Sequence, residues 1–172
     1  MIRTIGLFWT ADDVFWGAGK QPGKLLGVPK DNVTASPVDF RDQVGIYVLY
    51  ADFDLIYVGQ TGIGDQRLLS RLKTHRKDSL LGRWNKFSWF GVRWVKQTGG
   101  LAGVTRAAHP ELAEVLDHME AILIYASEPP LNRQGGRWGD KLEWYVQRRD
   151  PRLGPTDSER ISKILDRLNQ LG

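Results

Sequence analysis

Two short apolar runs in the first third of the chain predict a β-hairpin. Residues 44–50 and 55–58 are rich in β-branched and aromatic side chains, and residues 51–54 between them have the character of a turn. Because both runs are short and largely apolar, we expect each strand to be buried on both faces. A third strand is predicted at residues 83–95, where apolar and polar side chains alternate.

Helical spacing of apolar residues follows in two places. In residues 65–78, three leucines form a stripe with basic residues around it. Residues 110–127 give the clearest helix, which has a broad apolar face and a proline suited to the first turn. Two prolines at 129 and 130 end it.

A further amphipathic helix is predicted near the C-terminus. Thr156 and Glu159 have the spacing of a capping box. The apolar stripe behind them consists of Ile161, Ile164, Leu165, Leu168 and Leu171. Such a helix either docks on the body of the protein or pairs with another chain, which leaves a monomer and a homodimer open.

These patterns divide the chain into three parts. Residues 1–40 become rich in glycine and proline after an apolar run and predict loop or short strands, an extension that packs on the core. Residues 41–133 hold the hairpin and the main helices, and residues 134–172 hold a basic, aromatic segment and the last helix. Trp9, Phe15 and Trp16 are expected to cover one face of the central part.

Composition is that of a globular protein with a modest positive charge. The 172 residues include 24 Lys and Arg against 20 Asp and Glu, a net charge of +4, which suits a polyanionic partner without identifying one. With no cysteine, disulfides and thiolate metal sites are excluded. No apolar run reaches the ~18–20 residues needed to cross a bilayer, and the first residues lack the layout of a signal peptide. We therefore expect a cytoplasmic protein that does not enter membranes.

Some of these residues have the chemistry to hydrolyse a phosphodiester. Arg71 and His75 are four residues apart and project from one helix face, which is typical of a solvated basic face or of a phosphate contact. Glu120 lies at the edge of an apolar helix face, where an arginine or a metal ion would satisfy it. Tyr47 and Tyr57 could transfer a proton once their pKa is brought toward the working pH.

The order of these residues resembles the GIY-YIG nuclease family. Its first motif reads here as Gly45-Ile46-Tyr47 and its second as Tyr57-Val58-Gly59. Arg71 and His75 follow within the string RLKTH, Glu120 lies within HMEAILI, and Asn132 ends PPLN. All five elements occur in order over roughly residues 42–133.

The resemblance implies a compact α+β domain with a three-stranded antiparallel sheet flanked by helices. It implies catalytic roles for Tyr47, Tyr57, Arg71, His75 and Glu120, with Glu120 holding Mg²⁺ or Mn²⁺. Either tyrosine, helped by His75, could take the proton of the attacking water. Nucleic acid would be contacted by residues near the arginine and after the glutamate, namely Arg67, Lys73, Arg76 and Asn132, the last of which would also fix loop geometry.

The function implied is a metal-dependent endonuclease that acts on DNA, with RNA not excluded. The alternative is a nucleic-acid-binding module that keeps the fold and does not cut. That alternative would use tryptophans for stacking on bases beside arginines for the backbone. The tryptophans concerned are Trp84, Trp89, Trp94, Trp138 and Trp144.

Overall fold

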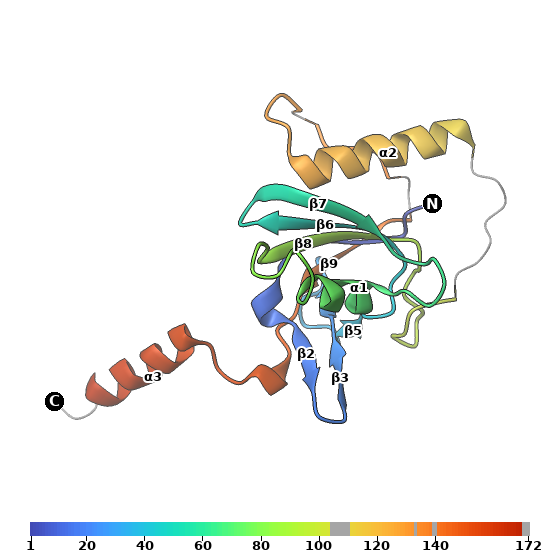
Figure 1. The fold of residues 1–172 in the computed structure, drawn as a ribbon. Coiled ribbons are helices and arrows are strands. Elements are labelled where there is room, and N and C mark those ends of the chain that lie inside the picture. The colour runs from blue at the N-terminus through green and yellow to red at the C-terminus, as the bar shows by residue number, and fades with distance from the viewer. Residues whose placement is uncertain (104–110, 133, 139–140, 170–172) are drawn as a thin grey trace.

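The computed structural model describes residues 1–103, 111–132, 134–138 and 141–169 (Figure 1). In chain order, its elements are β1 (Thr4–Thr10), η1 (Ala11–Asp13), β2 (Phe15–Ala18), β3 (Gln21–Lys24), β4 (Leu26–Pro29), β5 (Val38–Asp39), β6 (Gly45–Ala51), β7 (Asp54–Gln60), α1 (Leu68–His75), β8 (Lys86–Gly91), α2 (Leu112–Ser127), β9 (Glu143–Gln147), η2 (Pro151–Leu153) and α3 (Asp157–Asn169).

Within the described residues, the body is built on one seven-stranded mixed sheet. The strand order is β5-β4-β9-β1-β8-β6-β7, and a separate two-stranded sheet joins β2 and β3. Neighbours pair antiparallel except β1 and β9, which are parallel. The predicted α+β class is confirmed, whereas the predicted three-stranded sheet is wrong: β7, β6 and β8 are only one end of a larger sheet.

The N-terminal residues form a central strand. β1 pairs with β8 on one side and with β9 on the other, so that Ile5 lies between Phe90 and Trp144. Trp9 is buried in the core, which is the favourable environment for its large aromatic ring. β1, which falls within the predicted extension of residues 1–40, is therefore a strand in the interior of the sheet. The glycine-rich part begins later and forms the β2–β3 hairpin.

The predicted hairpin of residues 44–58 exists as β6 and β7, and its two strands differ in burial. β6 is covered on both faces, and Tyr47, Val48, Leu49 and Tyr50 are all buried. β7 is largely exposed, contrary to the prediction. It is the last strand of the sheet in the described chain, so one of its edges has no neighbouring strand.

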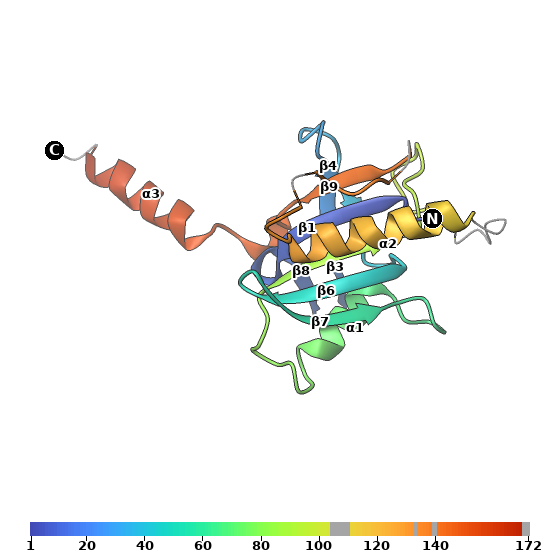
Figure 2. The same cartoon turned by 90° about the horizontal axis from the view of Figure 1, so that it is seen from above.

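Helices lie on both faces of the sheet, as Figures 1 and 2 show. Tyr47 and Leu49 point to the face where Leu68 and Leu72 of α1 complete one core cluster. Val48 and Tyr50 point to the opposite face, where Ala126 of α2 joins a second cluster. Alternation along β6 thus assigns each side chain to the α1 face or to the α2 face.

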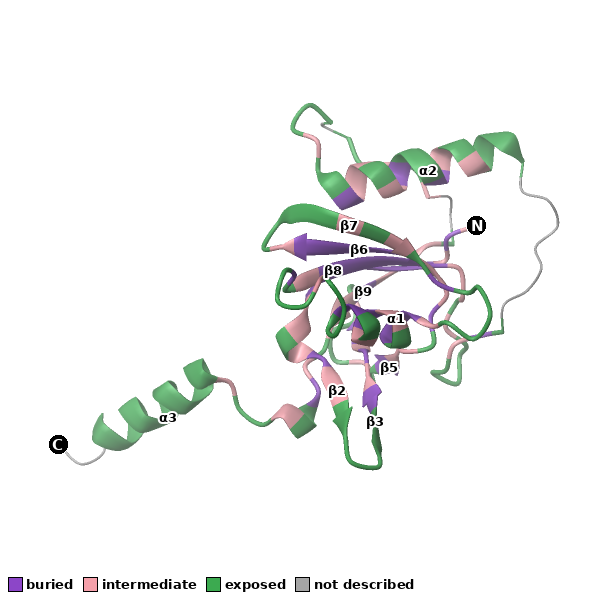
Figure 3. Cartoon of the chain, viewed as in Figure 1, coloured by how far each residue is buried: buried purple, intermediate pink, exposed green. Residues whose placement is uncertain are grey.

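The C-terminal part contributes β9 to the sheet and then leaves the body. The predicted capping box of α3 is confirmed: Thr156 N–H donates to Glu159 Oε2 at 2.7 Å, and Glu159 N–H donates to Thr156 Oγ1 at 3.2 Å. Figure 3 shows α3 exposed along its length and separate from the body, so it does not dock there. Pro110 and Leu171, assigned to helices above, lie outside the described residues. None of the helices described is long and apolar enough to span a membrane.

Candidate functional site

A tyrosine, a histidine and an aspartate form a hydrogen-bonded chain on the α1 face, in which Tyr47 and His75 are buried and the Asp78 side chain is 35% exposed. The Tyr47 hydroxyl lies 2.7 Å from His75 Nε2, and His75 Nδ1 lies 2.7 Å from Asp78 Oδ2. The second oxygen of Asp78 accepts the Leu80 N–H, and this bond, followed by the one from His75, lowers the pKa of Asp78. An ionised Asp78 accepts the Nδ1 proton, so Nε2 accepts the Tyr47 hydroxyl proton.

Arg71 and Tyr57 complete this cluster. The ring of Tyr57 packs on His75 with centroids 4.8 Å apart, and on Tyr47 with centroids 6.1 Å apart. Burial raises the pKa of Tyr47, and the Arg71 guanidinium opposes that rise. Raised above 10, the pKa keeps the Tyr47 hydroxyl protonated near neutral pH. Tyr47 is therefore a donor to His75 in the resting protein.

The cluster opens to solvent through a groove along the edge of the sheet. Its volume is about 650 Å³, and it is lined by Ile46, Tyr57, Val58, Gly59, Gln60, Ile63, Gln66 and Arg71. Tyr57 is half-buried in its wall, whereas Tyr47 behind it is fully buried. Among the described residues, Arg71 Nε has no hydrogen-bond partner. The groove thus presents the Tyr57 phenol and the Arg71 guanidinium, whose Nε atom is itself buried.

Two motif glycines have steric reasons to be glycine. Gly45 has φ of +149°, and a Cβ there would overlap the carbonyl oxygen of Phe90 on the adjacent strand. A Cβ on Gly59 would overlap the Tyr47 hydroxyl. Gly59 lies opposite Tyr47 in the β6–β7 ladder, so the second motif makes room for the tyrosine of the first.

The start of α1 is fixed by the segment before β6. Leu68 N–H donates to the Gln43 carbonyl at 3.0 Å, and Leu69 N–H donates to the Arg41 carbonyl at 3.0 Å. Arg67 and Ser70 supply further bonds at the N-terminal cap, including Arg67 N–H to Ser70 Oγ at 2.9 Å. These bonds set where Arg71 and His75, in the later turns of α1, meet the sheet.

The basic residues predicted to contact nucleic acid surround α1 in two groups. Arg67 lies at the groove end, where its guanidinium donates to the carbonyls of Gly64 and Gln66. Arg76 lies at the other end, with its guanidinium 4.4 Å above the Trp16 ring. Lys73 lies on the same side, near Gly17 of the β2–β3 hairpin. All three are on the α1 side of the sheet.

Glu120 and Asn132 are not brought to this cluster. Glu120 is exposed on α2, and α2 packs on the opposite face of the sheet from Tyr47 and His75. Asn132 is exposed in the turn after α2, where its N–H donates to the Pro129 carbonyl at 3.0 Å. In the described part of the chain no three His, Asp or Glu side chains gather as a metal site. The residues of the groove therefore do not fit a metal ion held by Glu120.

Asp78 is the member of the cluster that the sequence prediction missed. It follows His75 by three residues in the string HRKDS, one turn beyond the end of α1. A histidine with a carboxylate at this spacing is a usable signal, because side chains three apart meet on a helical turn.

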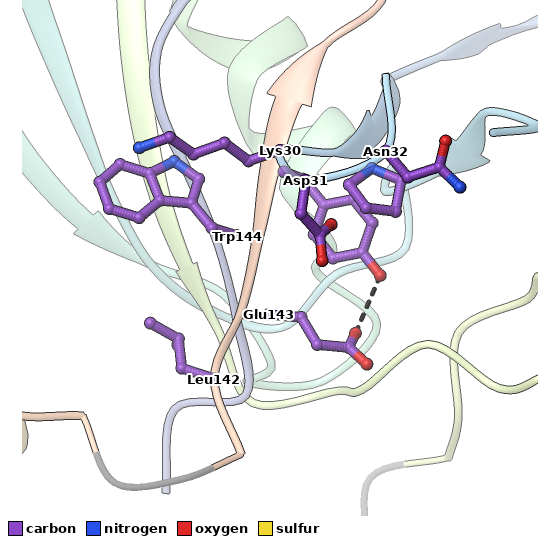
Figure 4. Close-up of a pocket in the computed structure, with 8 residues that line it drawn as sticks. Lys30, Asp31, Asn32, Leu142, Glu143 and Trp144 are labelled. Atoms are coloured by element: carbon purple, nitrogen blue, oxygen red, sulfur yellow. Dashed lines mark hydrogen bonds between the residues drawn. The ribbon is translucent and has the colours of Figure 1, made fainter. Parts of the chain in front are cut away.

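Three of the five tryptophans offered for base stacking are packed against other parts of the protein. Trp84 and Trp89 are buried, and Trp138 stacks against Phe90. Trp94 is 38% exposed and has a free surface. The fifth, Trp144, lies in a larger cavity of about 810 Å³ between the Lys30 loop and β9 (Figure 4).

That larger cavity is already filled in part by the chain itself. The Lys30 ammonium lies 3.8 Å from the centroid of the Trp144 ring, and the Tyr145 hydroxyl donates to Glu143 Oε2 at 2.8 Å (Figure 4). A base could stack on Trp144 only after displacing Lys30. The groove at Arg71 is therefore the stronger candidate site.

Comparison of the chain with protein-family models, curated proteins and solved structures finds no match.

Proposed function

We propose that this chain is an endonuclease that hydrolyses phosphodiester bonds in DNA at the groove beside Arg71. The observation that carries the proposal is the hydrogen-bonded series Tyr47, His75 and Asp78, which lies next to Tyr57 in the groove wall through packing of the two tyrosine rings. A tyrosine alone is a weak base at neutral pH. A histidine held by an ionised carboxylate is a suitable proton acceptor.

Arg71 would bind the scissile phosphate. Its guanidinium lines the groove and stays charged at all working pH values. Charge-assisted bonds from arginine to phosphate oxygens stabilise the charge that develops as water attacks. Because the same guanidinium adjoins Tyr47, a bound phosphate would lie next to the tyrosines.

The structural difference between the two tyrosines suggests different roles. Tyr57 is half-buried in the groove wall and would contact the attacking water. Tyr47 is fully buried and donates to His75. We propose that the water proton passes along Tyr57 and Tyr47 to His75 Nε2, and that Asp78 stabilises the resulting imidazolium. The scissile P–O bond breaks as the water oxygen bonds to phosphorus, and the departing sugar oxygen takes a proton from solvent.

No step of this mechanism passes through a metal ion, because Glu120 lies on the far face of the sheet from the groove. Mg²⁺ or Mn²⁺, as the family resemblance implies, would supply charge neutralisation at the phosphate if it bound elsewhere at the substrate.

Nicking of supercoiled plasmid tests the proposal. We expect Tyr57→Phe and Arg71→Gln to lower the nicking rate by about 100-fold or more, with urea midpoints close to the unmodified protein. Matched controls are Tyr125→Phe, on the α2 face, and Arg148→Gln, at the end of β9; both should cut normally. Unchanged nicking by Tyr57→Phe and Arg71→Gln would rule out this groove as the active site.

The alternative function, binding without cleavage, is favoured by the distance of Glu120 from the groove. Arg67, Lys73 and Arg76 would then hold the backbone on the α1 side. Its signature would be salt-dependent binding of DNA by the unmodified chain, with no nicking under any metal condition, and loss of that binding in Arg71→Gln.

A further inference from the structure

The α3 helix has an apolar stripe that nothing in the described chain covers. Ile161, Ile164, Leu165 and Leu168 recur at helical spacing and are each between 55% and 59% exposed. In Figures 1 and 3 the helix extends from the body with solvent around it. Burial of such side chains is favourable, so a stripe left in water indicates a missing contact.

The α2 helix also has an apolar face that no described residue covers. Its inner side packs on the sheet through residues such as Ala126, Ile122 and Tyr125. Its outer side carries a stripe at spacings of four, three and four residues, exposed between 52% and 74%: Leu112, Leu116, Met119 and Leu123. A helix that is apolar on all sides is normally buried on all sides.

The charges that border the two stripes are complementary, and the α2 stripe is long enough to cover the α3 stripe. At ~1.5 Å per residue, 161–168 covers ~10 Å and 112–123 covers ~16 Å. Arg160, Lys163 and Arg167 each precede a stripe residue and form a basic row along one side of α3. Asp117 and Glu120 follow stripe residues of α2 and form an acidic row. With the helices parallel and face to face, the basic row lies beside the acidic row.

From these two faces we infer that the chain forms a homodimer in which α3 of each copy packs on the outer face of α2 of the other copy. The arrangement is a two-fold exchange of helices, so both contacts form at once and both stripes are covered in both copies. Nothing in it depends on the proposed nuclease activity.

The segment before α3 favours packing of α3 on the α2 of a second copy and not on the α2 of its own chain. The Arg149 guanidinium donates to the Asp12 carbonyl at 3.1 Å and to Asp13 Oδ1 at 2.6 Å. Asp150 is buried and binds Arg152. Beyond the η2 turn that these bonds hold, the short segment 154–156 leads to α3, and three residues reach at most ~11 Å. Figure 1 shows α3 leaving the body on the opposite side from α2.

Two exposed substitutions and their mixture test the exchange. By light scattering after size exclusion, the unmodified chain should have about twice its monomer mass of 19.5 kDa. Ile164→Glu in α3 and Leu116→Glu in α2 should each give monomers. Each variant keeps one intact face, so an equimolar mixture should recover a heterodimer. Ser162→Glu, on α3 but off the stripe, should remain dimeric.

Each other outcome overturns the inference in a distinct way. If Leu116→Glu stays dimeric while Ile164→Glu does not, α3 pairs with α3. If the unmodified chain is a monomer whose α3 resists protease, α3 docks on its own body. A monomer whose α3 is cut rapidly would show that both stripes stay in water.

Discussion

Gly59 lies against the Tyr47 hydroxyl so closely that residue 59 has no room for a Cβ. The two residues face each other across the β6–β7 ladder, with Tyr47 covered by α1 on the same face. The position of the buried tyrosine, and with it the bond to His75, therefore depends on the absence of one methyl group on the edge strand.

Gly59→Ala should accordingly displace Tyr47 and loosen this corner of the sheet. We expect the free energy of unfolding to fall by about 1–3 kcal/mol, the usual cost of an added methyl in a packed site. Urea denaturation measures it. Gly100→Ala is the control, since a Cβ there meets no atom within 4 Å. Equal stability of the two variants would show that Tyr47 can shift freely.

Asp78→Asn should reduce catalysis with little effect on substrate binding. Asparagine keeps the shape of aspartate but cannot balance a positive charge on His75. If the groove is the active site, kcat for plasmid nicking should fall at least about tenfold while KM stays nearly constant. Asp31→Asn, an exposed change in the Lys30 loop, should leave both constants unaltered. A rise in KM alone would assign Asp78 to binding.

Substitution of Gln43 should lower the free energy of unfolding strongly, because its buried side chain makes several hydrogen bonds. Its buried amide donates to Thr4 Oγ1 at 2.9 Å and to the Arg93 carbonyl at 3.0 Å, and accepts from Val44 and Arg93 N–H. Gln43→Leu leaves these groups unpaired, so we expect a loss of about 3 kcal/mol or more in urea unfolding. Gln97→Leu, on an exposed loop, should cost much less; similar losses would contradict the role of the network.

The attachment of α2 should weaken in mild acid because of His118. Burial, and next the N-terminal ammonium, lowers the pKa of His118, whose Nδ1 accepts the Ile2 N–H at 3.0 Å. The unfolded chain takes up a proton near pH 6.5 and the folded one only at lower pH. Stability should therefore fall as the pH drops below about 6.5 toward the folded pKa.

The variant His118→Gln keeps an acceptor that does not titrate. Urea midpoints at pH 7.5, 6.5 and 5.5 should decline less in His118→Gln than in the unmodified chain. Parallel decline in both proteins would assign the acid sensitivity to other groups.

Metal dependence discriminates between two positions of Glu120. With the helix as it lies here, Glu120→Ala should nick plasmid like the unmodified chain, in Mg²⁺ and in Mn²⁺ alike. Loss of nicking both in EDTA and in Glu120→Ala would show that α2 brings its carboxylate to the groove in another arrangement. Loss of nicking in EDTA but not in Glu120→Ala would show that a metal ion is needed and that residues other than Glu120 hold it.

Local patterns predicted the elements that depend on neighbours in sequence. The β6–β7 hairpin, α1 and the α3 cap each rest on residues only a few positions apart. The cluster of Tyr47, Tyr57, Arg71 and His75 also follows from local order, because a hairpin and the next helix must pack together. The places of β1 and β9 could not be read this way, since Ile5 pairs with Trp144, far along the chain.

Glu120 shows a second limit of sequence patterns. α2 carries apolar residues on two sides, one including Ala121 and Tyr125 and the other including Leu116 and Leu123. Periodicity identifies the helix but does not choose which side meets the sheet. The direction of Glu120 depends on that choice, so its distance from Arg71 could not be predicted from the sequence.

The central place of β1 has a consequence for synthesis of the protein. β1 leaves the ribosome before both of its partner strands, which begin at residue 86 and at residue 143. Until then the backbone groups along the edges of β1 have no partner strand, and the β6–β7 hairpin has only part of its sheet. Closing such long loops is slow, because contacts distant in sequence form late. A nascent chain that has not yet reached the end of β9 at residue 147 should therefore be a ready substrate for chaperones.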